Sequence, residues 1–213
     1  MNHHLVTTKI FLISCLSAIA ADWPHWLGPN GDGISLETDW KNEINAPIWK
    51  AKVGIGFSAV SVANDKLYTM GHDGKKSAGQ ETVYCLNAQS GKSIWSQSYP
   101  APLVDYLHEG GPCSTPTVDG SIVYTISKHG LLHAYQAKDG KVIWRKDMMK
   151  EAGMKRPPEW GFAASPYVLG DQLIIEAAPP IHSIKRRGKL FGKVRPTAPL
   201  MARPPCSNRV ENQ

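Results

Sequence analysis

The stretch VYCLNAQSGKSIW, residues Val83–Trp95, returns 49 residues later as LHAYQAKDGKVIW, residues Leu132–Trp144. Each copy begins with an apolar run, turns at a Ser-Gly or Asp-Gly pair, and ends on a second apolar run that carries the tryptophan. Gly91 and Gly140 accept the positive φ that a tight hairpin requires. Each copy therefore predicts two antiparallel strands joined by a short turn.

A second repeated unit precedes each hairpin. It comprises two apolar runs, found at Ser58–Val62 with Lys66–Met70, at Ser114–Val118 with Ser121–Thr125, and a third time at Ala164–Val168 with Gln172–Ile175. The combined unit is four short strands in about 50 residues, which is the period of a propeller blade. A β-sandwich with chance internal similarity is the alternative, but the hairpin and its tryptophan recur in one register.

We therefore predict an all-β chain, a β-propeller of four-stranded blades. It is incomplete, with about two to three blades present where a closed ring needs about four to eight. We divide the chain into a signal peptide (1–21), an N-terminal segment with a first outer strand (22–56), the propeller repeats (57–176) and a basic tail (177–213).

The formal net charge of +6 comes from the ends of the chain. Residues 22–180 carry 15 Lys and Arg against 17 Asp and Glu, whereas residues 181–213 carry eight Lys and Arg against one Glu. A body close to neutrality offers no electrostatic footprint for nucleic acid. We expect no nucleic-acid partner.

The N-terminus has the features of an export signal. Met1–Lys9 is polar with one positive charge, Ile10–Ala21 is apolar and too short to span a bilayer, and Ala18-Ile19-Ala20 fits the small-x-small cleavage pattern. We predict a periplasmic or secreted protein that is cleaved near Ala20. Two alternatives are a buried N-terminal helix and lipid attachment at Cys15, where LISC resembles a lipobox and would bring membrane association.

Cleavage would remove Cys15 and leave Cys85, Cys113 and Cys206. An odd number of cysteines in an exported chain does not indicate a disulfide scaffold. Cys85 lies in an apolar run and is interpreted as a small core residue. A Cys85–Cys113 bridge stays open as an alternative, although no feature of the sequence requires it.

The Ala-x-x-Gly-Lys-x-x-Trp segments, Ala88–Trp95 and Ala137–Trp144, resemble the pyrroloquinoline-quinone (PQQ) repeat. The resemblance implies that Trp95 and Trp144 dock between neighbouring blades, with Gly91 and Gly140 in the turns of the motif. Asp22–Gly33 resembles the mature start of exported PQQ-binding-like propellers. Ile48-Trp49-Lys50 resembles their first outer strand, which often closes the ring against the last blade. The resemblance covers Asp22 to about Glu176 and is specific for the fold.

Propellers of this family divide by function into quinoprotein alcohol dehydrogenases, which use PQQ, calcium and a catalytic Asp, and scaffolds such as the outer-membrane assembly-factor lipoprotein. The sequence lacks the adjacent cysteine pair that many of these dehydrogenases place over the quinone, and neither their calcium ligands nor their catalytic Asp can be assigned. We predict a non-enzymatic interaction scaffold with protein partners and without cofactor, metal or catalytic residue. The alternatives are part of a PQQ- and calcium-dependent oxidoreductase, and a non-functional fragment.

Two loops resemble those that lead into the blades of the family, and such loops tend to face the central channel. They supply weak candidates for binding a ligand in a full propeller, namely Gly110, Gly111, Trp160 and Gly161. A metal could be bound by Asp105, His108 and Glu109, but their spacing matches no strong signature and a solvated loop fits better.

The remaining polar residues have structural interpretations. His129 and His133 alternate with apolar residues, which places them toward solvent or a neighbouring strand. Asp73, Asp119 and Asp139 each lie beside a glycine and are interpreted as turn residues. A hydrolase triad is not supported, because no His and Asp partners are evident for Ser114 and Ser165.

The repeat is interrupted after Glu176. Where a third hairpin with Gly-Lys and Trp is expected, a basic, Pro-rich stretch follows. One interpretation is a disordered tail. The other interpretation is a frameshift. Codons can be chosen for Ile181–Lys193 that, read two bases later, encode Ser-Leu-Asp-Lys-Lys-Thr-Gly-Lys-Thr-Val-Trp-Lys, which is the missing repeat. Codons chosen for Pro199–Asn208 encode, in the same shifted frame, Tyr-Gly-Ser-Pro-Thr-Val-Phe-Glu, which resembles the start of a fourth blade. We hypothesise a frameshifted tail on a C-terminally truncated propeller.

Overall fold

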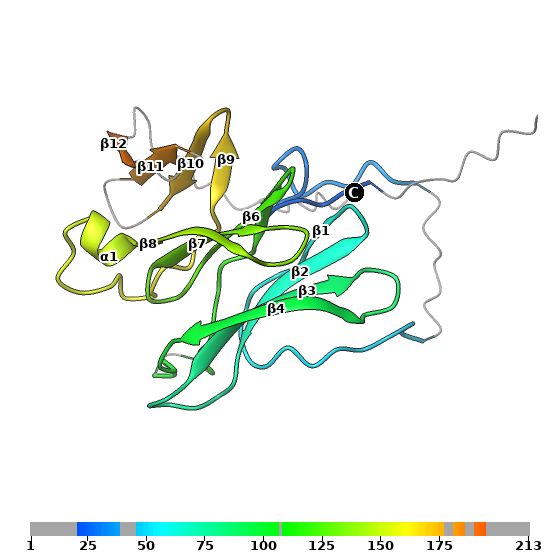
Figure 1. Cartoon of the computed structure of the whole chain (residues 1–213), viewed down its shortest axis with the longest axis horizontal. Coiled ribbons are helices and arrows are strands. Elements are labelled where there is room, and N and C mark those ends of the chain that lie inside the picture. Colours follow the sequence, from blue (N-terminus) through cyan, green and yellow to red (C-terminus); the bar gives the residue numbers. More distant parts are fainter. Residues whose placement is uncertain (1–20, 39–45, 107, 177–180, 186–189, 195–213) are drawn as a thin grey trace, which may run out of the picture.

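The computed structural model describes residues 21–38, 46–106 and 108–176, and the backbone of two further strands at 181–185 and 190–194. This part of the chain is nearly all β and forms three four-stranded antiparallel sheets (Figure 1). Neighbouring strands of each sheet are neighbours in the sequence. None of its helices is long and apolar enough to cross a membrane.

The three sheets have the same order of strands. The first contains β1 (Ser61–Ala63), β2 (Lys66–His72), β3 (Gln80–Asn87) and β4 (Ser93–Pro100). The second contains β5 (Thr117–Asp119), β6 (Ile122–Ile126), β7 (Leu131–Gln136) and β8 (Val142–Asp147), followed by a single helical turn, α1 (Met148–Glu151). The third contains β9 (Tyr167–Leu169), β10 (Gln172–Ile175), β11 (Ile181–Lys185) and β12 (Leu190–Val194). Repeated four-stranded sheets of this kind are propeller blades, so the predicted fold class is confirmed.

The third sheet holds two strands that the sequence pattern did not predict. β11 pairs with β10 from Gln172↔Lys185 to Ile175↔His182, and β12 pairs with β11. The interruption of the repeat after Glu176 therefore does not end the sheet. Without β11, the edge of β10 would leave its backbone groups unpaired, and the chain that follows supplies the partner.

The predicted hairpins form because their turns satisfy their own polar groups. In the first hairpin the Gly91 N–H donates to the Asn87 carbonyl at 2.9 Å, and in the second the Gly140 N–H donates to the Gln136 carbonyl at 2.9 Å. The two glycines have φ of +67° and +73°, as the sequence predicted. Both hairpins also carry a β-bulge at the same place, between Cys85 and Leu86 and between Ala134 and Tyr135.

Each pair of neighbouring sheets shares a hydrophobic core. Between the first and second sheets the core includes Tyr68, Val83, Trp95, Val123 and Tyr135. Between the second and third it includes Tyr124, Leu132, Phe162, Leu173 and Ile175. The burial pattern thus follows the two-residue period of the strands, with one face of the second sheet in each core.

The same kinds of side-chain to backbone hydrogen bond recur along the array of sheets. At the outer side, Trp95 Nε1 donates to the Ala137 carbonyl at 3.1 Å, and Trp49 Nε1 donates to the Ala88 carbonyl at 3.0 Å. At the inner strands, the Ser61 hydroxyl donates to the Pro116 carbonyl, and the Thr117 hydroxyl donates to the Pro166 carbonyl at 2.6 Å. The repeat in the sequence is therefore a repeat of contacts between blades.

The N-terminal segment crosses the inner strands (blue in Figure 1). Trp23 exchanges two backbone hydrogen bonds with Val62 of β1, at 2.8 and 2.9 Å. The Pro24 carbonyl accepts from the Val118 N–H of β5 at 2.7 Å, and the His25 ring meets the Tyr167 ring of β9 edge-on at 5.9 Å. One short segment therefore touches the first strand of all three sheets.

Candidate functional site

Four connections leave the sheets at one end, because strands alternate in direction along each blade. They are the loops β2–β3 (73–79), β4–β5 (101–116), β6–β7 (127–130) and β8–β9 (148–166). We call this the loop end. Both loops that are predicted to lead into blades lie here, and the buried polar residues His72, Glu81 and Lys128 lie in these loops or next to them.

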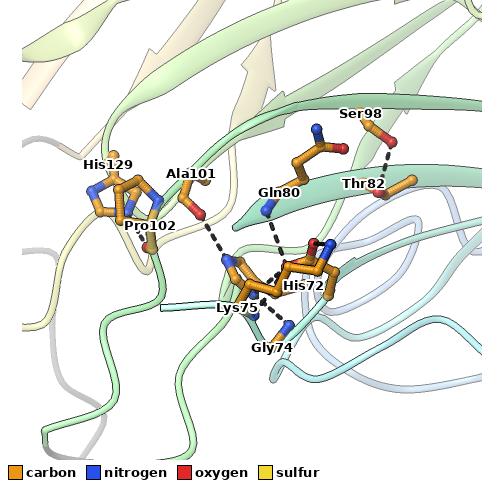
Figure 2. Close-up of polar contacts among 10 residues, drawn as sticks. His72, Gly74, Lys75, Gln80, Thr82, Ser98, Ala101, Pro102 and His129 are labelled. Carbon is orange, nitrogen blue, oxygen red and sulfur yellow. Dashed lines mark hydrogen bonds and ion pairs between the residues drawn. The ribbon is translucent and has the colours of Figure 1, made fainter. Parts of the chain in front are cut away.

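His72 closes the loop end of the first sheet. Its Nε2 lies 2.7 Å from the Ala101 carbonyl, and its Nδ1 accepts the Gly74 N–H at 2.9 Å (Figure 2). Because Nδ1 accepts, the proton of the neutral ring is on Nε2, which donates to Ala101. His72 therefore joins the end of β2 to the chain leaving β4, and both of its ring nitrogens are used in doing so.

The neighbouring turn is organised by Asp73. Its carboxylate accepts the backbone N–H of Lys75 at 3.1 Å and that of Gln80 at 3.2 Å. The backbone hydrogen bonds from Lys75 and Gln80 stabilise the ionised carboxylate, and they therefore hold the pKa of Asp73 below its usual value. The predicted role of Asp73 as a turn residue describes this arrangement, in which Lys75 and Gln80 face the same turn (Figure 2).

Glu81 is a buried carboxylate at the junction of the first two sheets. It is only 1% exposed, although it lies on β3 beside the core residue Val83. The Tyr99 hydroxyl donates to its Oε2 at 3.0 Å, and the backbone N–H of Lys128 points at its Oε1 from 3.4 Å. Burial raises the pKa of Glu81, and burial together with the Glu81 charge raises the pKa of Tyr99.

Lys128 is a buried cation at the same junction. The residue is 6% exposed, and its Nζ lies 2.9 Å from His108 Nε2 and 3.5 Å from the Val104 carbonyl. Among the residues described, no carboxylate pairs with it. A buried ammonium without a counter-ion is costly, so this group favours a nearby anion.

The contacts of His108 strengthen that conclusion. Its Nδ1 accepts the Gly110 N–H at 3.0 Å, so the proton of the neutral ring is on Nε2. That N–H then faces the Lys128 ammonium, which also donates. An anionic acceptor beside the pair would satisfy both donors.

Three of the four weak ligand candidates, Gly110, Trp160 and Gly161, contact or face this pair, and Gly111 lies against Ile55. Gly110 bonds to His108, and the Trp160 ring is parallel to the His108 ring, at an interplanar angle of 3° and a centroid distance of 6.5 Å. A Cβ on Gly161 would lie 2.6 Å from Lys128 Cγ, and a Cβ on Gly111 would lie 2.5 Å from the Ile55 carbonyl oxygen. A cavity of about 280 Å³ lies beside them, lined by residues 54–57 and 109.

The three residues weighed as a possible metal site, Asp105, His108 and Glu109, have separate surroundings where contacts are described. Asp105 pairs with Lys76 at 2.8 Å, and His108 faces Lys128. In the described parts of the chain no three His, Cys, Asp or Glu side chains are placed to hold a metal ion. Cys85 is fully buried, as predicted, and it and Cys113 are free cysteines, so the Cys85–Cys113 bridge does not form.

The other candidates lie in structural contacts. His129 Nε2 is 2.8 Å from the Pro102 carbonyl (Figure 2), and His133 is buried against the neighbouring sheet. The Ser114 hydroxyl donates to the Ile126 carbonyl at 2.6 Å, and the Ser165 hydroxyl accepts the Thr115 N–H at 2.8 Å. Within the described residues, neither serine has a histidine as hydrogen-bond partner. Asp119 ends β5, and Asp139 accepts the Lys141 N–H in the β7–β8 turn at 3.0 Å.

The four residues predicted to dock neighbouring blades are Trp95, Trp144, Gly91 and Gly140. A Cβ on Gly140 would lie 2.6 Å from the Trp95 ring, and a Cβ on Gly91 would lie 2.4 Å from the Trp49 ring. Trp144 has its ring tilted against Tyr124 at 5.9 Å. The turn of the third blade on which Trp144 is predicted to dock lies outside the described residues.

Sequence reasoning missed Glu81, Tyr99 and Lys128. A signal for Glu81 exists, because it has the same parity along β3 as Val83 and Cys85, which places it on the buried face. No comparable signal exists for Lys128. Its neighbours His108 and Glu81 are 20 and 47 residues away in the sequence, and only the packing of two blades brings them together.

Several known proteins are similar to this chain. A family model described as outer membrane protein assembly factor BamB matches residues 79–180. The quinohemoprotein alcohol dehydrogenase from Comamonas testosteroni is 18% identical with a TM-score of 0.56, over 83% of this chain and 28% of that one. A europium-containing methanol dehydrogenase is 13% identical with a TM-score of 0.50, over 68% and 26%. BamB from Moraxella catarrhalis is 16% identical with a TM-score of 0.43, over 63% and 37%. No curated protein sequence matches significantly.

The repeated sheets and the matched structures define a β-propeller protein. Within that class, the family model that matches residues 79–180 supports a PQQ-repeat β-propeller family. It spans between 26% and 37% of the length of the three solved structures. The two dehydrogenases, at 13% and 18% identity, bear on the fold alone.

Proposed function

We propose that this chain is part of an exported PQQ-like propeller that acts as a non-enzymatic interaction scaffold. The observation that carries the proposal is how the loop end uses its polar groups. His72, Asp73, Glu81 and His129 all contact the protein's own backbone or a neighbouring side chain. They hold loops and blades in place, and they do not converge as an acid, a base and a nucleophile around a reaction centre.

The outer strands supply a surface for partners. β4 and β8 are edge strands of their sheets, and each exposes an isoleucine next to its docking tryptophan. Ile94 is 43% exposed and Ile143 is 45% exposed, at positions 49 residues apart. Open edge strands with apolar side chains are suited to pairing with or packing against another protein chain.

The first residues of the predicted mature chain make side-chain hydrogen bonds with the rest of the described chain. The Ala21 nitrogen donates to a Glu37 carboxylate oxygen at 2.7 Å, and the Asp22 carboxylate accepts the Asn64 N–H at 3.1 Å. Cleavage after Ala20 would turn the Ala21 nitrogen into an ammonium beside Glu37. The signal peptide itself lies outside the described residues.

Sequencing the N-terminus of the protein recovered from the periplasm or medium tests export. We expect Ala21 or Asp22 as the first residue. A chain that retains Met1 would contradict export, and a lipid-modified Cys15 at the N-terminus would replace simple cleavage by membrane anchoring.

Photo-crosslinking in cells tests the scaffold. A photoreactive amino acid is placed at Ile94, at Ile143, or at the control position Leu36, which is 82% exposed and lies in no strand. We expect the same discrete adduct from Ile94 and Ile143 and none from Leu36. Indistinguishable adducts at all three positions, or none at the two edge strands, would contradict a scaffold that binds through them.

The quinoprotein alternative draws support from one observation. The buried Lys128 ammonium contacts His108, whose ring is parallel to that of Trp160, and this arrangement fits a planar anion, which is the chemistry of PQQ. The described residues do not provide the accompanying calcium site, since no three carboxylate, His or Cys ligands converge there. We therefore derive no catalytic step through a quinone in this chain.

Dye-linked alcohol oxidation separates the two functions. The full-length protein is incubated with PQQ and Ca²⁺, and dye reduction is followed with primary alcohols. The scaffold proposal expects no turnover above the level of PQQ alone. Turnover that falls in a Lys128→Met variant, but not in a Lys138→Met variant on the opposite turn, would replace the scaffold by an oxidoreductase.

A further inference from the structure

A second cavity lies between β4 of the first sheet and β7 and β8 of the second. It has a volume of about 380 Å³. Polar and aromatic side chains line much of it, including Gln97, Ser98, Tyr99, His133, Tyr135 and Arg145. This volume is in the range of small-molecule sites, roughly 300–1,000 Å³. Both sheets that form the cavity are complete in this chain.

One wall is a continuous aromatic stack. Tyr99 from β4 stacks on His133 at a centroid distance of 4.7 Å, and His133 stacks on Tyr135 at 5.3 Å, with an interplanar angle of 14°. The stack lines this side of the cavity with aromatic groups, against which an aromatic ligand can pack.

His133 also contributes a polar atom without a partner. The residue is 5% exposed, and within the described part of the chain no hydrogen-bond partner is found for its buried Nδ1. Buried nitrogens are normally satisfied, so this atom is available to a ligand in the cavity that His133 lines. Burial and, to a smaller degree, the Arg145 charge lower the pKa of His133 to about 4, against a smaller opposing effect of the Leu131 backbone. The ring is therefore neutral near pH 7 and offers one donor and one acceptor nitrogen.

Arg145 provides the charge of the site. It is the register partner of His133 across β7 and β8, and its side chain is exposed. No ion pair of Arg145 is found within the described residues, and no carboxylate lines the cavity. A free guanidinium is a donor fork for a carboxylate.

We infer that this cavity binds a small aromatic carboxylate. The carboxylate pairs with Arg145, the ring packs on the wall formed by Tyr99, His133 and Tyr135, and a hydroxyl substituent meets His133 Nδ1. The inference goes beyond the scaffold function and does not depend on it, because the cavity is formed by two blades alone.

Isothermal titration calorimetry on the full chain tests the inference with four probes. Benzoate and 4-hydroxybenzoate carry both ring and charge, benzyl alcohol carries the ring without the charge, and acetate carries the charge without the ring. We expect binding of the first two only, with 4-hydroxybenzoate the tighter. Heat from neither aromatic carboxylate at millimolar concentration, or equal affinity for benzyl alcohol, would overturn the inference.

Variants of the charged residue locate the site. Arg145→Gln is expected to weaken benzoate by about tenfold or more through loss of a charge-assisted pair, and Arg145→Lys by less because the charge is kept. Arg156→Gln removes an equally exposed arginine from the β8–β9 loop and is expected to change nothing. Unchanged affinity in Arg145→Gln would show that the carboxylate binds elsewhere and would refute the assignment.

A variant of the histidine tests the polar contact separately. His133→Phe keeps an aromatic ring in the stack and removes Nδ1. We expect it to bind benzoate as the parent protein does but to lose the preference for 4-hydroxybenzoate. A preserved preference would refute the role of His133.

Discussion

At the scale of single residues, the rim of each blade is held by a tryptophan and a glycine that act together. The Trp95 ring lies against Gly140, and its Nε1 reaches the Ala137 carbonyl. Trp49 is placed in the same way against Gly91 and Ala88. Because the ring needs the space of a missing Cβ and the N–H needs a carbonyl three residues before the glycine, the spacing Ala-x-x-Gly is a packing requirement.

Substituting the glycine tests this requirement. Gly140 and Gly120 both have positive φ, +73° and +56°, so alanine strains the backbone at both positions. Only at Gly140 would the new Cβ meet a tryptophan ring, whereas Gly120 faces open space. We expect Gly140→Ala to lower the free energy of unfolding by about 1–3 kcal/mol more than Gly120→Ala, measured by urea denaturation. Equal losses would show that the tryptophan does not depend on this glycine.

The buried Glu81 carboxylate predicts a pH dependence of stability. Its pKa is raised in the folded state above its value in the unfolded chain, where it is near 4.5. The folded state therefore keeps this proton to higher pH, and its contribution to stability, full below the unfolded pKa, is lost as pH rises through the folded pKa. Glu81→Gln keeps an acceptor for the Tyr99 hydroxyl but carries no charge.

We expect the difference in free energy of unfolding between Glu81→Gln and the parent to move in favour of the variant as pH rises from about 4 to about 8. Urea denaturation at several pH values measures it. His133 acts in the opposite sense, since its lowered pKa removes stability as pH falls from 6.5 to about 4, but it is common to both proteins. A difference that does not change with pH would mean that the Glu81 pKa is not raised.

At the scale of elements, we expect deletion of the N-terminal segment to weaken hydrogen bonds locally. Residues 22–25 accept or donate backbone hydrogen bonds at Val62 and Val118 and reach Tyr167, so one segment joins the first strands of three sheets. In a variant lacking residues 21–28, we expect the amide hydrogens of Val62 and Val118 to exchange much faster with solvent. The Val123 amide on β6, which is part of the sheet ladder, is the control. Equal acceleration of all three amides would indicate global unfolding instead of a lost local contact.

The elements that sequence could predict are those whose local pattern and tertiary role agree. The two hairpins correspond to β3–β4 and β7–β8, since alternation and a positive-φ glycine suffice for them. β11 and β12 were missed because nothing local in Ile181–Val194 distinguishes them; they pair because β10 offers an edge. At the candidate site, the glycine-containing loops were found, but the Lys128–His108 pair was not, because its partners are distant in the sequence.

At the scale of the whole molecule, the tail after Glu176 carries a prediction about the gene. The family model stops matching at residue 180, close to the point where the repeat is interrupted. If a frameshift produced the tail, the DNA read two bases later stays open and encodes further Gly-Lys-x-x-Trp repeats. Sequencing the DNA across and beyond this region measures this directly. A shifted frame that closes at once, or lacks those motifs, would refute the frameshift.

The described sheets themselves cannot close a ring. Three blades fall below the number typical of propellers, about four to eight, so sheet faces that would pack on further blades are left without them. Trp49 shows this at one end, since it occupies the place of an outer-strand tryptophan but lies in no strand of the described chain. Uncovered blade faces and edges promote association between chains.

The central claim, that this chain is an open array of propeller blades, is tested most directly by its mass in solution. Light scattering after size-exclusion chromatography should give a mass above 23.4 kDa that increases with protein concentration, because open blades associate. A monomer of 23.4 kDa at every concentration, with a single sharp melt, would show a closed and self-sufficient fold and would contradict the account.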